Sequence, residues 1–315
     1  MNSTRTIALS VLSVVFLAIS GLFVLPATAR QLEVPDLIQS FPAGPGPFRL
    51  AFDGANIWVT SLDSYNVTKL RASDGAILGA FPVGDYTTGV AFDGVNIWVT
   101  MWSGTTVTRL RASDGSFQGS FSCGGEAPWD ILFDGENIWV VNGYSDNLVK
   151  LRPSDGALLG SVYIGVFPNT EAFDGANIWV TSANSDTVTK VRASDLVVLG
   201  NYDVGGWPIG VVFDGTCMWV ANAGDGTVTK LRASDGAPQG TVKIGQTASY
   251  LAFDGIHIWV TDQDDNTLTR LRRSNGAVQH IYSPGSEPNG VLFDGASIWV
   301  ANRDSDTVTK YTPGR

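Results

Sequence analysis

One eight-residue phrase recurs seven times along this chain of 315 residues, and it constrains the fold more than any other feature. Its first copy, residues 52–59, reads FDGANIWV, its last, residues 293–300, reads FDGASIWV, and successive copies are 40 or 41 residues apart. A unit of this length, rich in β-branched and aromatic residues and punctuated by Asp-Gly turns, cannot bury both faces of its own small sheet. The units must therefore pack against one another.

Each unit contains four strand-like runs that are separated by turn residues. In the second unit these runs cover residues 89–92, 96–100, 106–112 and 117–123. Asp93 and Gly94 form the first turn, because Asp and Gly tolerate the positive φ angles that tight hairpins need. The pattern predicts a four-stranded antiparallel meander, which would be one blade of a larger ring.

Seven such blades around an axis make an all-β, seven-bladed β-propeller. The recurring tryptophans fall at one equivalent position in every unit, and we expect them to fill the contacts between blades: Trp58, Trp98, Trp139, Trp179, Trp219, Trp259 and Trp299. The last unit ends after its third strand, whereas residues 36–44 match the fourth strand of the first full unit. We therefore predict that this N-terminal strand completes the last blade, so that residues 30–315 form a single domain.

The first twenty-nine residues differ from the repeats. Residues 7–24 are apolar apart from Ser and Gly, and residues 27–29, Ala-Thr-Ala, fit a signal-peptidase site. We predict that residues 1–29 are a signal peptide and that the protein is secreted, periplasmic or part of the cell envelope. The apolar run is longer than usual for such a peptide, so an uncleaved membrane anchor is the alternative. A net charge of -10 repels phosphate backbones and argues against nucleic acid as a partner.

The connections between strands lie on two opposite faces of such a ring. The turns after the first and third strands share one face and hardly vary, whereas the other connections differ from unit to unit and form what we call the variable face. Differences among otherwise equal repeats are expected where binding specificity lies. Trp102, Trp129 and Trp207 all fall on this face, and we expect the first two to be neighbours. They suit sugars, small apolar molecules or peptide side chains, or they simply cover the central channel.

Polar residues also interrupt the apolar pattern of the variable face: Arg49, Asp130, Glu171, Tyr250 and Arg303. The positions equivalent to Glu171 hold Leu, Val or Ile in the other six units. A carboxyl group in an apolar row should have a raised pKa unless a cation compensates its charge. Glu171 is therefore either functional or paired with a nearby Arg or Lys.

Basic residues recur along the third strands of the units, as at Lys190 and Arg192. We expect these side chains to be solvated, because charged residues commonly protect exposed strands.

The repeat resembles the bacterial and archaeal β-propeller family that is named for its Tyr-Val-Thr-Asn phrase. The matching residues in the fifth unit are 208–212 (PIGVV), 214–215 (DG), 219–222 (WVAN) and 227–229 (TVT), with Trp in place of that family's Tyr. The resemblance implies a seven-bladed protein of the cell envelope or the extracellular medium.

The chain is more distantly similar to the streptogramin lyases, which are also seven-bladed. That resemblance implies a histidine, acidic residues and a divalent ion on the variable face, but here His257 falls in a turn of the opposite face and His280 in an outer strand. A still weaker likeness to gluconolactonase-like propellers, usually six-bladed, rests on Glu171 together with Asn142, Asn169 or Asn222.

Two functional hypotheses follow. The first is an exported, non-enzymatic, monomeric propeller that needs no cofactor and binds a protein or a small-molecule or carbohydrate ligand through its variable face. The alternative is a lyase or lactonase assisted by a divalent cation at Glu171. No catalytic or metal-binding residues are assigned under the first hypothesis, and the expected ligand-binding residues are Phe48, Arg49, Trp102, Trp129, Asp130, Glu171, Trp207, Tyr250 and Arg303.

Overall fold

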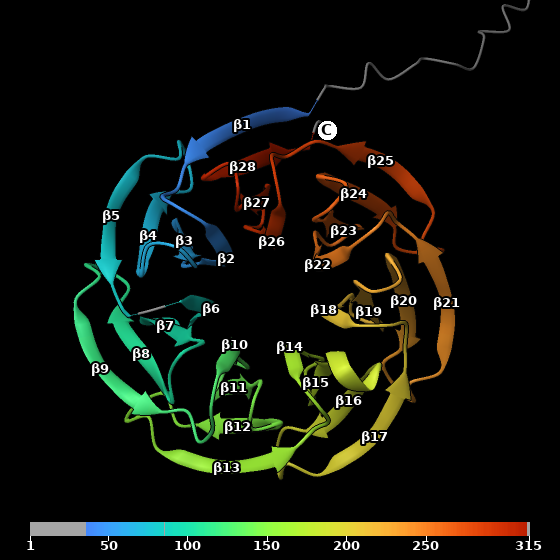
Figure 1. Cartoon of the computed structure of the whole chain (residues 1–315), viewed down its shortest axis with the longest axis horizontal. Helices are drawn as coiled ribbons and strands as arrows, with labels where there is room; N and C mark the ends of the chain where they lie inside the picture. The colour runs from blue at the N-terminus through green and yellow to red at the C-terminus, as the bar shows by residue number, and fades with distance from the viewer. Residues whose placement is uncertain (1–35, 85, 314–315) are drawn as a thin grey trace, which may run out of the picture. The chain divides into compact units, whose positions relative to one another are not determined.

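A computed structural model describes residues 36–84 and 86–313, so the predicted signal peptide lies outside the described residues. The described chain forms seven four-stranded antiparallel sheets arranged as blades around a central axis (Figure 1). This confirms the predicted all-β, seven-bladed propeller. Within the same residues, no helix is long and apolar enough to cross a membrane.

The blades follow the chain, and in each of them the first strand lies innermost. Blade 1 has β2 (Pro47–Phe52), β3 (Asn56–Ser61), β4 (Asn66–Arg71) and β5 (Ile77–Pro82), blade 2 has β6 (Thr87–Phe92), β7 (Asn96–Met101), β8 (Thr106–Arg111) and β9 (Phe117–Ser122), and blade 3 has β10 (Pro128–Phe133), β11 (Ile138–Asn142), β12 (Asn147–Leu151) and β13 (Leu158–Tyr163). Blade 4 has β14 (Pro168–Phe173), β15 (Asn177–Ser182), the short 3₁₀ helix η1 (Ala183–Ser185), β16 (Thr187–Arg192) and β17 (Val198–Asp203), and blade 5 has β18 (Pro208–Phe213), β19 (Cys217–Asn222), β20 (Thr227–Arg232) and β21 (Pro238–Lys243). Blade 6 has β22 (Ala248–Phe253), β23 (His257–Asp262), β24 (Thr267–Arg272) and β25 (Val278–Tyr282), and blade 7 has β26 (Pro288–Phe293), β27 (Ile298–Asn302), β28 (Thr307–Thr312) and β1 (Leu37–Pro42).

The ring is closed by its two ends, as predicted. Strand β1 pairs antiparallel with β28, with Leu37 opposite Thr312 and Pro42 opposite Thr307. In Figure 1 the first strand lies along the outside of the last blade. Because β1 provides the fourth strand of blade 7, the chain ends are held together by backbone hydrogen bonds of the same kind that build every other blade.

The recurring phrase encodes a hydrogen bond as well as a turn. In all seven blades the buried indole N–H of the framework Trp donates to the carboxylate of the Asp five residues earlier, at 2.7–2.8 Å. In blade 5, Asp214 accepts from Trp219 and also from the backbone N–H groups of Thr216 and Cys217. The carboxylate therefore satisfies a donor that would otherwise be buried without a partner, and it holds the hairpin turn together.

The expectation that the basic residues of the third strands are solvated is wrong for Lys69 and Lys190, which are buried. Lys190 is buried, lies 4.9 Å from the ring centre of Trp179, and donates from Nζ to the backbone carbonyl of Ala233 in the next blade at 2.7 Å. Arg192, two residues later, is exposed and pairs with Asp195 at 2.8 Å. Residues two apart in a strand share a face of the sheet, so the difference follows from position along the strand: Arg192 is the last residue of β16, whereas Lys190 lies inside it.

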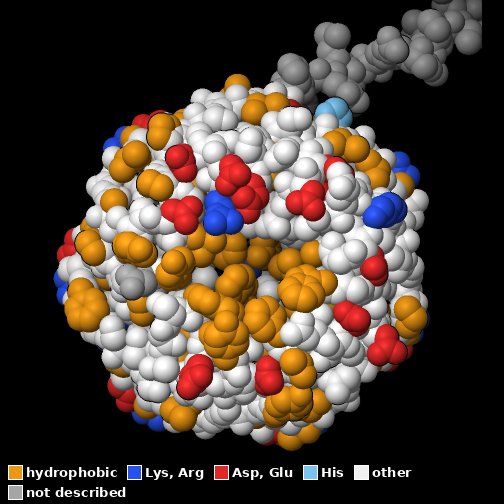
Figure 2. Space-filling view, viewed as in Figure 1, with side chains coloured by type: hydrophobic (Ala, Val, Ile, Leu, Met, Phe, Trp, Pro, Cys, Tyr) orange, Lys and Arg blue, Asp and Glu red, His pale blue; other side chains and the backbone are white. Residues whose placement is uncertain are grey.

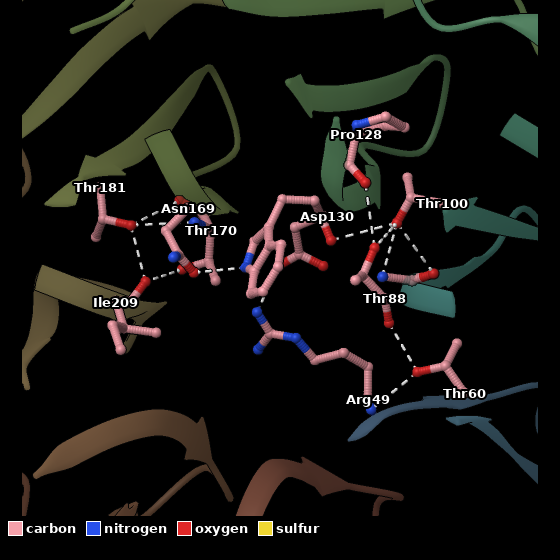
Figure 3. Close-up of polar contacts among 12 residues, drawn as sticks. Arg49, Thr60, Thr88, Thr100, Pro128, Asp130, Asn169, Thr170, Thr181 and Ile209 are labelled. Atoms are coloured by element: carbon pink, nitrogen blue, oxygen red, sulfur yellow. Dashed lines mark hydrogen bonds and ion pairs between the residues drawn. The ribbon is translucent and has the colours of Figure 1, made fainter. Parts of the chain in front are cut away.

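Threonines of the second strands connect neighbouring blades close to the channel. The Thr60 hydroxyl donates to the carbonyl of Thr88, and the Thr181 hydroxyl donates to the carbonyl of Ile209, at 2.7 and 2.8 Å (Figure 3). These bonds fix the innermost strands relative to one another. They therefore define the positions of the side chains that line the channel.

Candidate functional site

The connections of blades 2 and 3 build an open cavity of about 550 Å³ on the variable face. Four aromatic side chains line it and form what we call the aromatic cup: Tyr86, Trp102, Trp129 and Tyr144. Trp102 directly follows β7, Trp129 lies in β10, and Tyr144 follows β11. In Figure 2 apolar side chains gather around a hollow at the centre of the molecule.

The rings of the cup hold one another in place. The ring centres of Trp102 and Trp129 are 4.8 Å apart with an interplanar angle of 81°, which confirms that the two are neighbours. Tyr144 packs against Trp102 at 4.7 Å. The indole N–H of Trp129 donates to the side-chain carbonyl of Asn169 at 2.8 Å. Edge-to-face packing and this hydrogen bond position two large aromatic surfaces before any ligand arrives.

The residue before the first strand has a left-handed backbone in six of the seven blades. Tyr86, Phe167 and Trp207 have φ angles of 50°, 56° and 53°, and they stand where blade 1 has Gly46, whose φ is 60°. Left-handed backbone strongly favours glycine, and for a bulky residue it costs about 1–3 kcal/mol. Tyr86 lines the cup and Phe167 lies 5.9 Å from Trp102. Large aromatic side chains are thus placed on this face at some expense of stability.

A second cavity of about 190 Å³ lies in the central channel, where residues from the innermost strands of all seven blades surround it. Its polar residues are Arg49, Asp130, Glu171 and Tyr250, the channel cluster, together with Thr170. The Arg49 guanidinium lies 3.5 Å from the Asp130 carboxylate and 3.7 Å from the ring centre of Tyr250. Figure 3 shows the Arg49 side chain reaching toward Asp130.

Glu171 is the uncompensated member of this cluster. Its residue is 7% exposed, and neither carboxyl oxygen has a hydrogen-bond partner among the described residues. Burial raises the pKa of Glu171 well above its ordinary value, the nearby Asp130 raises it further, and Arg49 opposes both. Burial also raises the pKa of Asp130, although Arg49 partly offsets that shift. The expected elevation is therefore confirmed, whereas the expected direct pairing of Glu171 with a base is not found in the described part of the chain.

Phe48 connects the two cavities. Its ring lies 5.7 Å from that of Trp129 and 6.1 Å from that of Tyr250, so it packs between the aromatic cup and the channel cluster. The structure thus brings seven of the nine predicted residues into one continuous region: Phe48, Arg49, Trp102, Trp129, Asp130, Glu171 and Tyr250.

The two remaining predicted residues lie outside both cavities. Trp207 is 46% exposed and contacts Phe167 at 6.2 Å. Arg303 forms an ion pair with Glu287 at 3.0 Å.

Of the residues that line the cup, sequence reasoning predicted only Trp102 and Trp129, and those that it missed include Tyr86, Tyr144 and Glu126. For Tyr86 the repeat alignment held a usable indication, because a tyrosine replaces the glycine of blade 1.

The histidines lie elsewhere. His257 begins β23, and its Nδ1 is 3.1 Å from the Asp254 carboxylate, while His280 lies in the outer strand β25. Neither lines either cavity. Within residues 36–84 and 86–313, no group of three or more His, Cys, Asp or Glu side chains is arranged to hold a metal ion.

Fold and site together define a seven-bladed β-propeller with an aromatic cavity on its variable face. Similar solved structures include a streptogramin B lyase, with 18% identity and a TM-score of 0.77 over 89% of this chain and 98% of that one. Another is a catalytically inactive histidine-to-alanine variant of virginiamycin B lyase from Staphylococcus aureus with quinupristin, with 19% identity and a TM-score of 0.75 over 88% and 99%. Hydrazine synthase from Kuenenia stuttgartiensis matches with 17% identity and a TM-score of 0.74 over 85% and 96%.

At these identities the likeness shows the fold alone. It agrees with the resemblance to the streptogramin lyases seen in the sequence, and membership of the Tyr-Val-Thr-Asn family stays a prediction. No family model matches the chain, and no curated protein matches it either.

Proposed function

We propose that this protein is an exported, ligand-binding propeller that holds a small organic molecule in the aromatic cup. The observation that carries this proposal is the cavity of about 550 Å³, whose walls include two tryptophans at right angles and two tyrosines. Ligand pockets are typically concave and mostly apolar, with few polar groups. Ring faces offer a large contact area to a flat or apolar ligand.

The exposure of the tyrosines supports a binding role over a purely structural one. Tyr144 is 63% exposed and Tyr86 is 49% exposed, so both leave much of their apolar area in contact with water. A residue that only covered the channel would gain stability by burying that area.

The rigidity of the cup favours binding as well. Trp129 is fixed by the Asn169 hydrogen bond and by contact with Phe48, and Trp102 is fixed between Trp129 and Tyr144. Binding to side chains that are already ordered costs less conformational entropy than binding to mobile ones. A ligand can therefore be held with modest contact area.

The comparisons support binding without the reaction of the similar enzymes. One similar structure contains quinupristin, so this fold can hold a small organic molecule. That enzyme is inactive when a histidine is replaced by alanine, and here His257 and His280 line neither cavity. For the alternative, a divalent cation at Glu171, the positive charge of Arg49 beside the carboxylates is unfavourable.

The proposal is tested with the mature protein in a screen of mono- and oligosaccharides and small aromatic molecules, followed by ligand-observed NMR and tryptophan fluorescence. We expect Trp102→Ala to weaken binding of the hits by about ten-fold or more. Trp207→Ala is the matched control, because it removes an exposed tryptophan of the same face that lines neither cavity, and it should leave binding unchanged. An absence of hits, or hits that bind both variants like the wild type, would contradict the proposal.

A further inference from the structure

We propose that the ligand of the aromatic cup is a small organic cation with an alkylated, quaternary ammonium group. This inference rests on the proposed function and specifies its ligand. The faces of Trp and Tyr rings carry partial negative charge and attract cations, Trp most strongly. Four such rings line this single cavity.

Among the described residues, the protein places its own cations over all seven framework tryptophans and over four other rings. Lys190 lies 4.9 Å from the ring centre of Trp179, Lys230 lies 4.6 Å from that of Trp219, and Arg49 lies 3.7 Å from that of Tyr250. Across the described residues, by contrast, no Lys or Arg lies over any ring of the cup. The cup therefore presents aromatic faces that no cation of the described chain occupies.

The charge of the cavity lining points the same way. Glu126 lines the cup, and none of the described lining residues is a Lys or Arg. Glu126 takes part in no ion pair among the described residues. An unpaired carboxylate beside aromatic walls favours a cation over a neutral or anionic ligand. The net charge of -10 on the whole chain adds a long-range attraction for cations.

The chemistry of the walls selects among cations. A primary ammonium carries three N–H donors, and the faces of the four rings that line the cup offer no strong acceptor for them. A quaternary ammonium has no N–H donor to satisfy, and its methyl groups pack against ring faces. An alkylated ammonium therefore loses less on leaving water than a primary one.

Three molecules with the same skeleton test this inference on the mature protein. They are choline, its neutral carbon analogue 3,3-dimethylbutan-1-ol (dimethylbutanol below), and ethanolamine, which lacks the methyl groups. Binding is followed by tryptophan fluorescence and ligand-observed NMR. We expect choline to bind about ten-fold more tightly than either analogue. Glu126→Gln should weaken choline binding several-fold and leave dimethylbutanol binding unchanged, and Trp207→Ala should change neither. Thermal melts of each variant establish that it remains folded.

The outcomes separate this inference from the proposed function. If choline and dimethylbutanol bind equally, the cup is a general apolar site, so the proposed function stands and the cation inference is overturned. The same holds if choline fails to bind while a sugar or aromatic molecule from the screen binds in a Trp102-dependent manner. If no molecule from either experiment binds, both proposals fall. Choline binding that is unaffected by Trp102→Ala would also overturn the inference, because the cation would then be bound elsewhere.

Discussion

Replacing Glu171 by valine should stabilise the protein, because it installs the kind of apolar residue that the other six blades carry at this position. Val90, Val211 and Val291 occupy three of the equivalent sites. Glu171 is 7% exposed and its carboxyl oxygens have no hydrogen-bond partner in the described structure. Burying a polar group without partners costs about 1–3 kcal/mol, and more when it is charged. For a domain of this size, about 2–4 °C per kcal/mol gives an expected rise in Tm of about 2–12 °C.

The dependence of this gain on pH follows from the raised pKa of Glu171. Because its pKa in the folded protein lies above the ordinary value of 4.5, folding favours the protonated carboxyl. That contribution to stability is fully present below pH 4.5, and it is lost as the pH rises through the folded-state pKa of Glu171. The wild type therefore loses stability over this range and the variant does not. The advantage of Glu171→Val should be smallest near pH 4.5 and largest at neutral and mildly alkaline pH.

Differential scanning calorimetry at several pH values between about 4 and about 8 measures both effects. Glu136→Val is the matched control, since it makes the same substitution at an exposed turn on the opposite face, and it should shift Tm little at any pH. The reasoning is refuted if Glu171→Val melts below the wild type at neutral pH. It is refuted as well if the gain is equally large at the two ends of the pH range.

Three further predictions concern the ring itself. Deleting residues 33–43 removes β1 and should lower Tm sharply in calorimetry, and an unchanged transition would contradict closure by this strand. Asp214→Asn weakens the acceptor of the Trp219 indole and should lower the free energy of unfolding in urea at neutral pH by about 1–3 kcal/mol. Burial would raise the pKa of Asp214, but its hydrogen bonds outweigh that effect and lower the pKa below its ordinary value. The resulting stabilisation is therefore present above pH 3.8 and is lost as the pH falls through the lowered folded-state pKa, so the variant should converge with the wild type in acid. Lys190→Met keeps the apolar stem but removes the hydrogen bond to the next blade, and should lower the free energy of unfolding by about 1–3 kcal/mol in the same assay. The exposed control Arg192→Met should change the free energy of unfolding by no more than about 0.5 kcal/mol. Equal effects of the two substitutions would contradict the inter-blade role of Lys190.

Most of the fold could be predicted because the same pattern of strand and turn residues recurs seven times. In blade 2 the expected strand 96–100 is observed as Asn96–Met101, and the expected strand 117–123 as Phe117–Ser122. Closure by residues 36–44 followed from one missing strand at one end and one surplus strand at the other. The bond from Trp219 to Asp214 was less evident, since a turn aspartate has a sufficient local explanation and the indole N–H is positioned only by packing.

The candidate site was only partly predictable. Trp102 and Trp129 were expected to meet because they occupy adjoining connections of neighbouring blades. Tyr144 comes from the next connection along the ring, and its approach to Trp102 depends on how the two loops fold over the cavity. Arg303 looked equivalent to the other polar residues of the variable face, yet its partner is Glu287 and it lies outside both cavities.

By itself, the sequence determined the number of blades, the way they close and the residues that fill the contacts between them. Those features depend on interactions within a unit or between adjacent units, and the residues that make these interactions recur at a constant spacing in the sequence. Only the tertiary structure decided that four rings from different segments of the chain form one cup, that Lys190 lies between blades while Arg192 faces water, and that Glu171 remains unpaired beside Arg49 and Asp130. These outcomes depend on the direction and distance of side chains that are far apart in the chain, which residue spacing does not specify.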